Sequence, residues 1–142
     1  MADLSVPIQP QPTPDTAGFW AATAAGGLAL CWCPECRRYR QPPHERCAGC
    51  GGPVEFRAVS GRGRIHSYIV VGRAVAPGYQ DGSGQVIVLV DLEEQDGLRL
   101  VGRLEGPEDR AAEIGAAVEA RIVDLPGGDF RVPVFHLAPV IA

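Results

Sequence analysis

Two short cysteine motifs near the start of the chain constrain its fold more than any other feature. The first is Cys33-Pro34-Glu35-Cys36 and the second, after ten intervening residues, is Cys47-Ala48-Gly49-Cys50. Two such turns can bring four thiolates to one tetrahedral metal ion. We expect Cys33, Cys36, Cys47 and Cys50 to form this site. Structural zinc is the favoured ion, because four thiolates close its coordination shell and leave no open position for catalysis.

Two other chemistries use the same spacing. A rubredoxin-type iron would make a redox protein, and protein grown with excess iron would then be red. Thiol–disulfide exchange at the first motif is disfavoured because the βαβ context that such a motif needs is missing. The fifth cysteine, Cys31, is interpreted as a small buried apolar residue, although it could substitute as a ligand. His44 lies between the motifs, but four cysteines leave it no vacancy.

The composition bounds the class of protein. At 142 residues with 46% hydrophobic residues, the chain can bury the core of one domain, or of a small domain plus a module. Eighteen glycines and thirteen prolines indicate many turns and short elements. The net charge of −4 disfavours a polyanionic partner. All thirteen basic residues are arginine, which excludes a Schiff-base lysine.

The chain divides into three segments. Residues 1–15 carry four prolines and are expected to form a flexible or extended arm, with neither the apolar run nor the basic start of a signal peptide. Residues 16–59 hold a helix and the cysteine module, and residues 60–137 hold the main domain. Cysteines in knuckle spacing fit a reducing cytoplasm with a metal better than a secreted disulfide framework, so we expect a cytoplasmic protein.

The segment before the cysteines predicts a short helix from Thr16 to about Ala25, capped by Asp15 and ended by Gly26-Gly27. Its Phe19-Trp20 pair has two interpretations. The preferred one is that both rings pack on the metal module or on the main domain. The alternative is a partner-docking face, because exposed aromatic side chains are enriched in interfaces.

From Ser60 onward the apolar residues recur with the period of β-strands. In the first strand Ile65, Ile69 and Val71 should share one face, and the second strand should be buried on both sides. One short helix is expected between the third and fourth strands, ending at Gly115. Five strands in this order predict a mainly β protein whose main domain is a five-stranded OB-fold barrel. The expected strands are 64–71, 85–92, 98–104, 118–123 and 130–135, and the expected helix is 107–115.

Three further features bear on function. Gly61-Arg62-Gly63 resembles half of a dinucleotide fingerprint, but it precedes a strand, so we interpret it as a bulge or a close approach of two backbones. Arg62, Arg64 and Arg73 could bind the phosphates of a CoA ester, with an ordinary solvated surface as the alternative. The long loop from Arg73 to Gly84 carries Tyr79, and we expect it to reach a partner or a substrate.

The ordered set of motifs resembles the DUF35 family, which combines a rubredoxin-like zinc ribbon with an acyl-CoA-associated OB-fold. The resemblance covers residues 18–135. The residues that carry it, besides the cysteines and the aromatic pair, are Gly27-Leu28, Pro42-Pro43, Ser60-Gly61-Arg62-Gly63, Ser67-Tyr68, Pro77-Gly78-Tyr79, Ile114-Gly115 and Val132-Pro133-Val134-Phe135.

The resemblance implies a non-catalytic subunit of a hetero-oligomer. Such a subunit binds a thiolase-like or lipid-transfer-protein-like enzyme and helps it to bind or channel an acyl-CoA, which could be a steroid, fatty, aromatic or mevalonate-type thioester. The alternative is a single-stranded nucleic-acid-binding protein, because zinc ribbons and OB-folds recur there, but the acidic charge and few aromatics disfavour it. An independent enzyme has little support, because His66 and His136 lie in no nucleophile motif.

Overall fold

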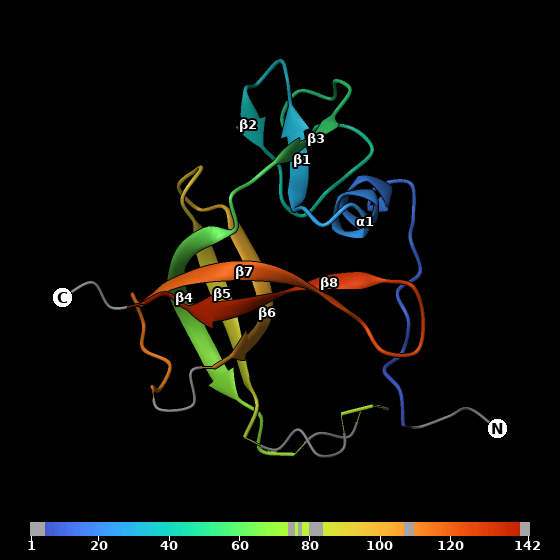
Figure 1. The fold of residues 1–142 in the computed structure, drawn as a ribbon. Helices are drawn as coiled ribbons and strands as arrows, with labels where there is room; N and C mark the ends of the chain where they lie inside the picture. The colour runs from blue at the N-terminus through green and yellow to red at the C-terminus, as the bar shows by residue number, and fades with distance from the viewer. Residues whose placement is uncertain (1–4, 74–75, 77, 80–83, 107–109, 140–142) are drawn as a thin grey trace.

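The chain folds into a small cysteine-bearing ribbon that sits on one end of a β-barrel, with a short helix beside the junction (Figure 1). This computed structural model describes residues 5–73, 76, 78–79, 84–106 and 110–139. No helix in this part of the chain is long and apolar enough to cross a membrane.

The ribbon is a three-stranded antiparallel sheet in the order β2-β1-β3. Its strands are β1 (Ala29–Cys33), β2 (Arg38–Tyr39) and β3 (Glu55–Ala58). The first cysteine motif forms the turn after β1, and the second lies between β2 and β3.

Helix α1 (Ala17–Ala24) forms where it was expected, but its start differs. The N-cap is Thr16 without a side-chain cap bond, and Asp15 instead accepts a hydrogen bond from the Thr13 hydroxyl, so the predicted Asp15 cap is wrong. The helix does end at the glycine pair. Gly26 has φ +87°, and the Gly27 N–H donates to the Ala22 carbonyl over 2.9 Å, as in a Schellman ending.

A glycine lets α1 approach the ribbon closely. A Cβ atom added at Gly18 would lie 2.1 Å from the ring of Phe56 in β3, so this ring rests directly on the helix backbone. The apolar side chains of the helix and ribbon thus join the core of the barrel. Leu28, Leu30 and Tyr39 belong to the same buried cluster as the barrel strands.

The five remaining strands form a closed barrel in the order β4-β5-β6-β8-β7, which is the topology of an OB-fold and confirms the expected fold class. The largest fully buried side chain, Phe135, fills the barrel beneath Gly102. The barrel strands are β4 (Arg62–Val70), β5 (Val86–Leu92), β6 (Arg99–Glu105), β7 (Ala117–Asp124) and β8 (Arg131–Leu137).

Two expectations about the faces of these strands are wrong. A bulge between Ile65 and Ser67 reverses the alternation of β4, so Ile65 is buried whereas Ile69 is 62% exposed. Strand β5 is not buried on both sides either. Val88 and Val90 face the core. Ile87, on the opposite face of the same strand, is only half-buried. An apolar run alone does not distinguish these two situations.

The expected helix between the third and fourth barrel strands is not found in residues 110–116, which contain turns and irregular backbone. The rest of that expectation, at residues 107–109, lies outside the described residues. Glycine at position 115 has φ +87°, as predicted for a helix ending, but here it serves a turn in which its N–H donates to the Ile65 carbonyl over 2.8 Å. Turn signals and helix-ending signals share this residue type, which explains the error.

The described part of the N-terminal arm, residues 5–15, runs along the barrel (Figure 1). Pro7 is buried, and a Cβ atom added at Gly78 would lie 2.3 Å from its nitrogen. The Gln9 side-chain amide donates to the Pro126 carbonyl over 2.9 Å. The arm therefore touches both the loop after β4 and the turn between β7 and β8.

Candidate metal centre and barrel surfaces

The four cysteines of the two motifs converge on one point, as the spacing predicts. Their sulfur atoms all lie within 4.8 Å of one another, with 3.6 Å between Cys33 and Cys50 and 3.8 Å between Cys36 and Cys47. A tetrahedral ion with metal–sulfur bonds of about 2.3 Å separates its sulfurs by about 3.8 Å. The four thiols are thus already spaced to bind one metal ion.

The two motifs place their sulfurs by the same backbone turn. The Arg37 N–H donates to the Cys33 carbonyl, and the Gly51 N–H donates to the Cys47 carbonyl, each over 2.8 Å. Both donors have positive φ, 52° for Arg37 and 72° for Gly51. Glycine adopts this conformation without strain, whereas arginine rarely does. The first motif therefore keeps the turn of the second even though its sequence lacks the glycine.

Backbone N–H groups point at the sulfurs. The Cys36 N–H donates to the Cys33 sulfur over 3.4 Å, and the Gly49 N–H donates to the Cys47 sulfur over 3.3 Å. Hydrogen bonds from the backbone N–H groups of Cys50 and, to a smaller extent, Gly49 lower the pKa of the Cys47 thiol to about 6. They outweigh the effect of burial, which raises this pKa. This turn therefore favours the thiolate, which is the form that binds metal.

The pKa of the Cys50 thiol shifts in the opposite direction. The Gly52 N–H lowers the pKa of Cys50, but the neighbouring Cys33 and Cys36 sulfurs outweigh it and raise the pKa to about 12. Four thiolates at this separation repel one another unless a cation lies between them. Arg40 supplies one positive charge nearby, and hydrogen bonding to the Cys36 and Cys47 sulfurs raises the pKa of its guanidinium.

The remaining candidate ligands stand apart from this cluster. Cys31 is fully buried, and its sulfur contacts the His44 carbonyl at 3.9 Å. Neither Cys31 nor His44 belongs to the group of ligand atoms that converge in the described chain. The donor set is therefore four sulfurs, which suits zinc or iron and closes a tetrahedral shell.

A hairpin turn of the barrel holds the ribbon in place. Gln95, between β5 and β6, bonds the Tyr39 backbone twice: its side-chain oxygen accepts from the Tyr39 N–H over 2.8 Å, and its amide donates to the Tyr39 carbonyl over 3.2 Å. The adjacent Glu94 accepts from the Ser60 N–H over 2.6 Å, at the junction of ribbon and barrel. The Gln95 bonds thus attach β2 to the barrel, and the Glu94 bond attaches the segment between β3 and β4.

We predict that Gln95→Ala loosens this junction. The change removes both bonds to Tyr39 and should lower the free energy of unfolding by about 1–2 kcal/mol. Thermal unfolding measures the loss, and faster hydrogen exchange at the Tyr39 amide localises it. Gln11→Ala in the exposed arm, where the side chain makes no hydrogen bond within the described chain, is the matched control. Unchanged exchange at Tyr39 would show that the ribbon does not depend on this contact.

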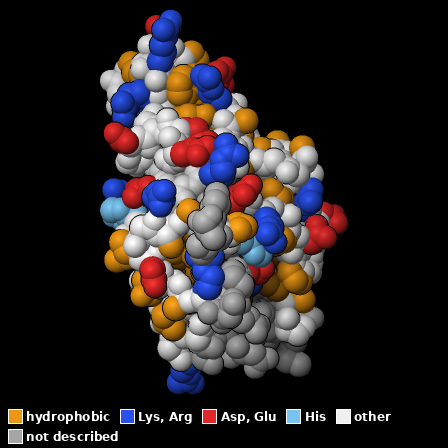
Figure 2. Space-filling view, turned by 60° about the vertical axis from the view of Figure 1, so that its left-hand side comes forward, with side chains coloured by type: hydrophobic (Ala, Val, Ile, Leu, Met, Phe, Trp, Pro, Cys, Tyr) orange, Lys and Arg blue, Asp and Glu red, His pale blue; other side chains and the backbone are white. Residues whose placement is uncertain are grey.

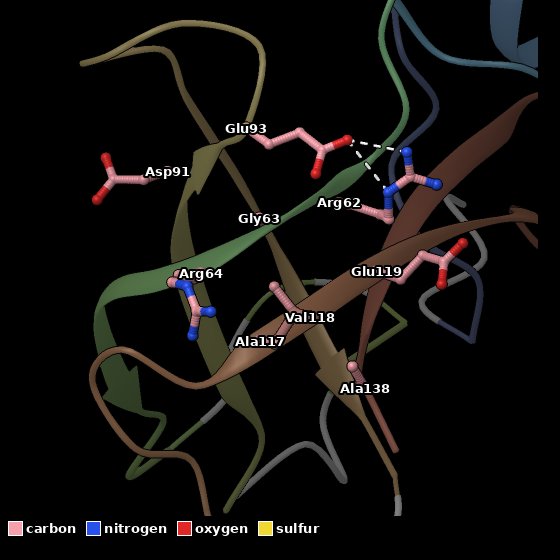
Figure 3. Close-up of a pocket in the computed structure, with 9 residues that line it drawn as sticks. All are labelled: Arg62, Gly63, Arg64, Asp91, Glu93, Ala117, Val118, Glu119 and Ala138. Carbon is pink, nitrogen blue, oxygen red and sulfur yellow. Dashed lines mark hydrogen bonds and ion pairs between the residues drawn. The ribbon is translucent and has the colours of Figure 1, made fainter. Parts of the chain in front are cut away.

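Arg62 and Arg64 lie on one side of β4 and line the same surface depression (Figure 3). The Arg62 guanidinium is paired with Glu93 at 2.9 Å, and Arg64 donates to the Gly115 carbonyl over 2.9 Å. The hydrogen bond from Arg62 lowers the pKa of the Glu93 carboxyl. Both arginines thus have partners within the chain, and both help to tie the barrel together.

The same depression is more acidic than basic. Asp91, Glu93 and Glu119 line it beside the two arginines, while Arg73 lies elsewhere, in the loop after β4. Three carboxylates against two guanidinium groups do not attract the phosphates of a CoA ester. The structure therefore brings together two of the three arginines singled out in the sequence, but in surroundings that favour the alternative of a solvated surface.

The aromatic candidates occupy two separate places. Phe19 packs against the core, and Trp20 meets Phe19 and Phe130 edge to face, with ring centroids 4.9 Å and 5.4 Å apart. These contacts agree with the packing interpretation of the pair. Tyr79 lines a pocket on the barrel, formed with the strand that contains Val132 and Pro133. The bonds made by Gln95 could not be predicted from the sequence, because polar residues are common in hairpin turns.

The fold and the site define a class of protein: a four-thiol ribbon joined to an OB-fold barrel. The family model described as "ChsH2, C-terminal OB-fold domain" matches residues 56–123, from β3 into β7. One chain of a solved structure, "Ltp2-ChsH2(DUF35) aldolase", is 30% identical and superimposes with a TM-score of 0.78, covering 91% of this chain and 98% of that one. The protein belongs to the DUF35 family, as its motifs led us to expect.

Two characterised relatives agree with this assignment. The alpha subunit of 3-oxo-4,17-pregnadiene-20-carboxyl-CoA hydratase from Mycobacterium tuberculosis is 30% identical over 124 residues, which is 87% of this chain and 39% of that subunit. A DUF35 domain-containing scaffold protein from Methanothermobacter thermautotrophicus is 34% identical over 87 residues, 61% of this chain and 54% of that protein. The chain thus spans about two fifths and about half of the lengths of these relatives.

A further solved structure shares the fold. It is a DUF35-family protein of unknown function from Sulfolobus solfataricus, which is 16% identical and superimposes with a TM-score of 0.56. It covers 84% of this chain. This likeness shows that the two proteins share a fold.

Proposed function

We propose that this chain is a non-catalytic accessory subunit in a complex with a thiolase-like enzyme, such as a thiolase or a lipid-transfer aldolase, and that it assists the binding or channelling of an acyl-CoA substrate. The observation that carries the proposal is the match to the DUF35 chain of an Ltp2-ChsH2 aldolase, which spans 98% of that chain. The two relatives described above, from Mycobacterium tuberculosis and Methanothermobacter thermautotrophicus, are an enzyme subunit and a scaffold protein.

The described residues support a role without catalysis of its own. The His66 ring bonds the Asp91 carboxylate at 3.0 Å, and Arg99 holds the other oxygen of that carboxylate at 2.8 Å. Within the described chain, no hydroxyl or thiol is hydrogen-bonded to this histidine, so it has no nucleophile to activate. The four-thiol site would likewise leave a bound metal without an open position.

We propose that zinc occupies the four-thiol site and that Cys33, Cys36, Cys47 and Cys50 hold it as thiolates. The ion would supply a cross-link between the two turns of a ribbon that is too small to fold on its own core. The backbone N–H groups that point at the sulfurs would orient the ligands. Colourless protein that contains one zinc ion per chain supports this assignment, and red protein would indicate iron instead.

Co-purification tests the proposed function. The tagged chain, expressed in its native host, should bring down one enzyme of the thiolase or lipid-transfer class in a fixed ratio, and that enzyme should turn over an acyl-CoA faster with the subunit than without it. Turnover of an acyl-CoA by the isolated chain would overturn the proposal, and so would the absence of any such enzyme from the purified complex.

A single-stranded nucleic acid is the alternative ligand for an OB-fold. On the face shown in Figure 2, acidic and basic side chains are interspersed from the ribbon at the top to the middle of the barrel. Nucleic-acid grooves instead concentrate positive charge and stacking aromatics. Salt-sensitive binding of an oligothymidylate by the purified chain would favour this alternative.

A further inference from the structure

Three of the four sulfurs in the proposed zinc site accept a hydrogen bond from the backbone, and the fourth does not. The N–H groups of Cys36, Gly49 and Gly52 donate to the sulfurs of Cys33, Cys47 and Cys50 over 3.4 Å, 3.3 Å and 3.4 Å. Within the described chain, the Cys36 sulfur accepts no backbone N–H. Such bonds stabilise a thiolate, so the Cys36 thiolate depends on a side chain for this stabilisation.

The Arg40 guanidinium provides it. Arg40 hydrogen-bonds to the Cys36 and Cys47 sulfurs, which lie 3.8 Å apart. The guanidinium lies against the second motif, because a Cβ atom added at Gly49 would be 3.0 Å from the Arg40 Cζ atom and closer still to Nη2. Arginine presents several N–H groups in a fixed plane, so one guanidinium can bridge two sulfurs, whereas lysine offers a single ammonium.

Arg40 has no other counter-charge in the part of the chain that the structure describes. No carboxylate there forms an ion pair with it, and its Nε atom is buried without a hydrogen-bond partner. Removing part of a cation from water costs free energy unless an anion compensates. The Cys36 and Cys47 sulfurs are therefore the groups that compensate the charge of Arg40.

The backbone around Arg40 is fixed by the ribbon and by the barrel. The Arg40 N–H donates to the Cys31 carbonyl over 2.8 Å. The preceding residue, Tyr39, is bonded twice by Gln95, and its hydroxyl donates to the Ala58 carbonyl over 2.8 Å. A fixed backbone lowers the entropy cost of holding the guanidinium over the two sulfurs.

We propose that Arg40 retains the metal ion by bridging the Cys36 and Cys47 thiolates, and that it shields these two sulfurs from electrophiles. This inference rests on the proposed zinc site but not on the proposed partner enzyme. Four thiolates and one divalent ion carry two net negative charges, of which the guanidinium cancels one. Its hydrogen bonds also withdraw electron density from the two sulfurs and so lower their nucleophilicity.

The Cys50 sulfur is the unshielded side of the site. Cys50 is exposed, and no side-chain cation is hydrogen-bonded to its sulfur within the described chain. Attack by an electrophile should therefore begin at Cys50, whereas the Cys36 sulfur, beneath the guanidinium, should react later.

The first test measures how fast the zinc-loaded full chain loses its metal to an excess of a chromogenic chelator. Arg40→Met removes the guanidinium but keeps the side-chain stem, and it should release zinc about tenfold faster than the wild type. Arg40→Lys keeps the charge without the bridge and should release zinc about threefold faster. The matched control is Arg38→Met, at an exposed site on β2 whose side chain has no hydrogen bond within the described chain, and it should change the rate by less than about twofold.

Alkylation by iodoacetamide distinguishes this role from a general loosening of the ribbon. With zinc in excess, tandem mass spectrometry of the digested protein gives the rate at each cysteine, and Cys50 should react first in the wild type. Arg40→Met should raise the rate at Cys36 by about fivefold or more and the rate at Cys50 by less than about twofold. A loosened ribbon would instead raise both rates together.

The outcomes separate this inference from the zinc assignment. If Arg40→Met releases zinc at the wild-type rate, the inference is wrong while the zinc assignment stands. If alkylation at Cys36 and Cys50 accelerates equally, Arg40 acts only on the stability of the ribbon, which also overturns the inference. If the wild type binds no zinc, both fail. Melting temperatures at saturating zinc confirm folding, and Arg40→Lys carries the test if Arg40→Met does not fold, with a wild-type release rate again overturning the bridge.

Discussion

Cys47→Ser should cost the protein its metal, its ribbon fold and its partner binding together. The Cys47 sulfur lies 3.8 Å from that of Cys36, and the residue is 4% exposed, so a serine hydroxyl there would replace a thiolate ligand at the centre of the site. Structural zinc supplies on the order of 10 kcal/mol to modules of this kind. Mass spectrometry of bound metal, circular dichroism and partner titration measure the three losses.

Cys31→Ala is the matched control for this change. Cys31 is equally buried but lies outside the four-sulfur cluster, so its replacement should retain one metal ion per chain and cost about 1 kcal/mol. If Cys47→Ser kept the metal and the fold while partner binding vanished, the cysteine would be a contact residue. If Cys31→Ala lost the metal, the assignment of four ligands would be incomplete.

Gly63→Val should give the second largest effect, a loss of about 3 kcal/mol in the free energy of unfolding. Gly63 lies on β4 where this strand pairs with both β5 and β7 and so closes the barrel. A Cβ atom there would lie 2.2 Å from the Asp91 carbonyl oxygen. A backbone atom cannot rotate away as a side chain can, so the strands themselves must separate.

Chemical denaturation of Gly63→Val measures this loss, with Gly72→Ala as the control. Gly72 has no heavy atom within 4 Å of an added Cβ, so that change should alter stability by less than about 0.5 kcal/mol. Equal stability of both variants would mean that the barrel tolerates a wider separation of β4 and β5. The expected contrast tests the interpretation of Gly61-Arg62-Gly63 as a close backbone approach, which the geometry of Gly63 already agrees with.

The wrong predictions for the faces of β4 and for the helix between β6 and β7 have a common cause. A single residue at the bulge after Ile65 moved Ile69 from the expected inner face to the solvent. Likewise, residues 110–116 carry helix-compatible sequence but form turns. In both cases the local pattern was compatible with two structures, and the closure of the barrel selected one of them.

The convergence of the four cysteine sulfurs could be predicted from the sequence alone, because Cys-x-x-Cys turns are local and their geometry follows from a few neighbouring residues. The alternation of apolar residues likewise determined the fold class and the position of nearly every strand. The cysteines thus remain the best-predicted part of this protein.

The surfaces that could bind a partner follow from the tertiary structure and could not be predicted from the sequence. The pocket that Tyr79 lines joins residues from three strands and two loops, and the bonds between Gln95 and Tyr39 connect residues 56 positions apart in the chain. The acidic neighbours of Arg62 and Arg64 likewise come from other strands. Such arrangements depend on which strand edges meet when the barrel closes, and a one-dimensional pattern carries no information about those distances.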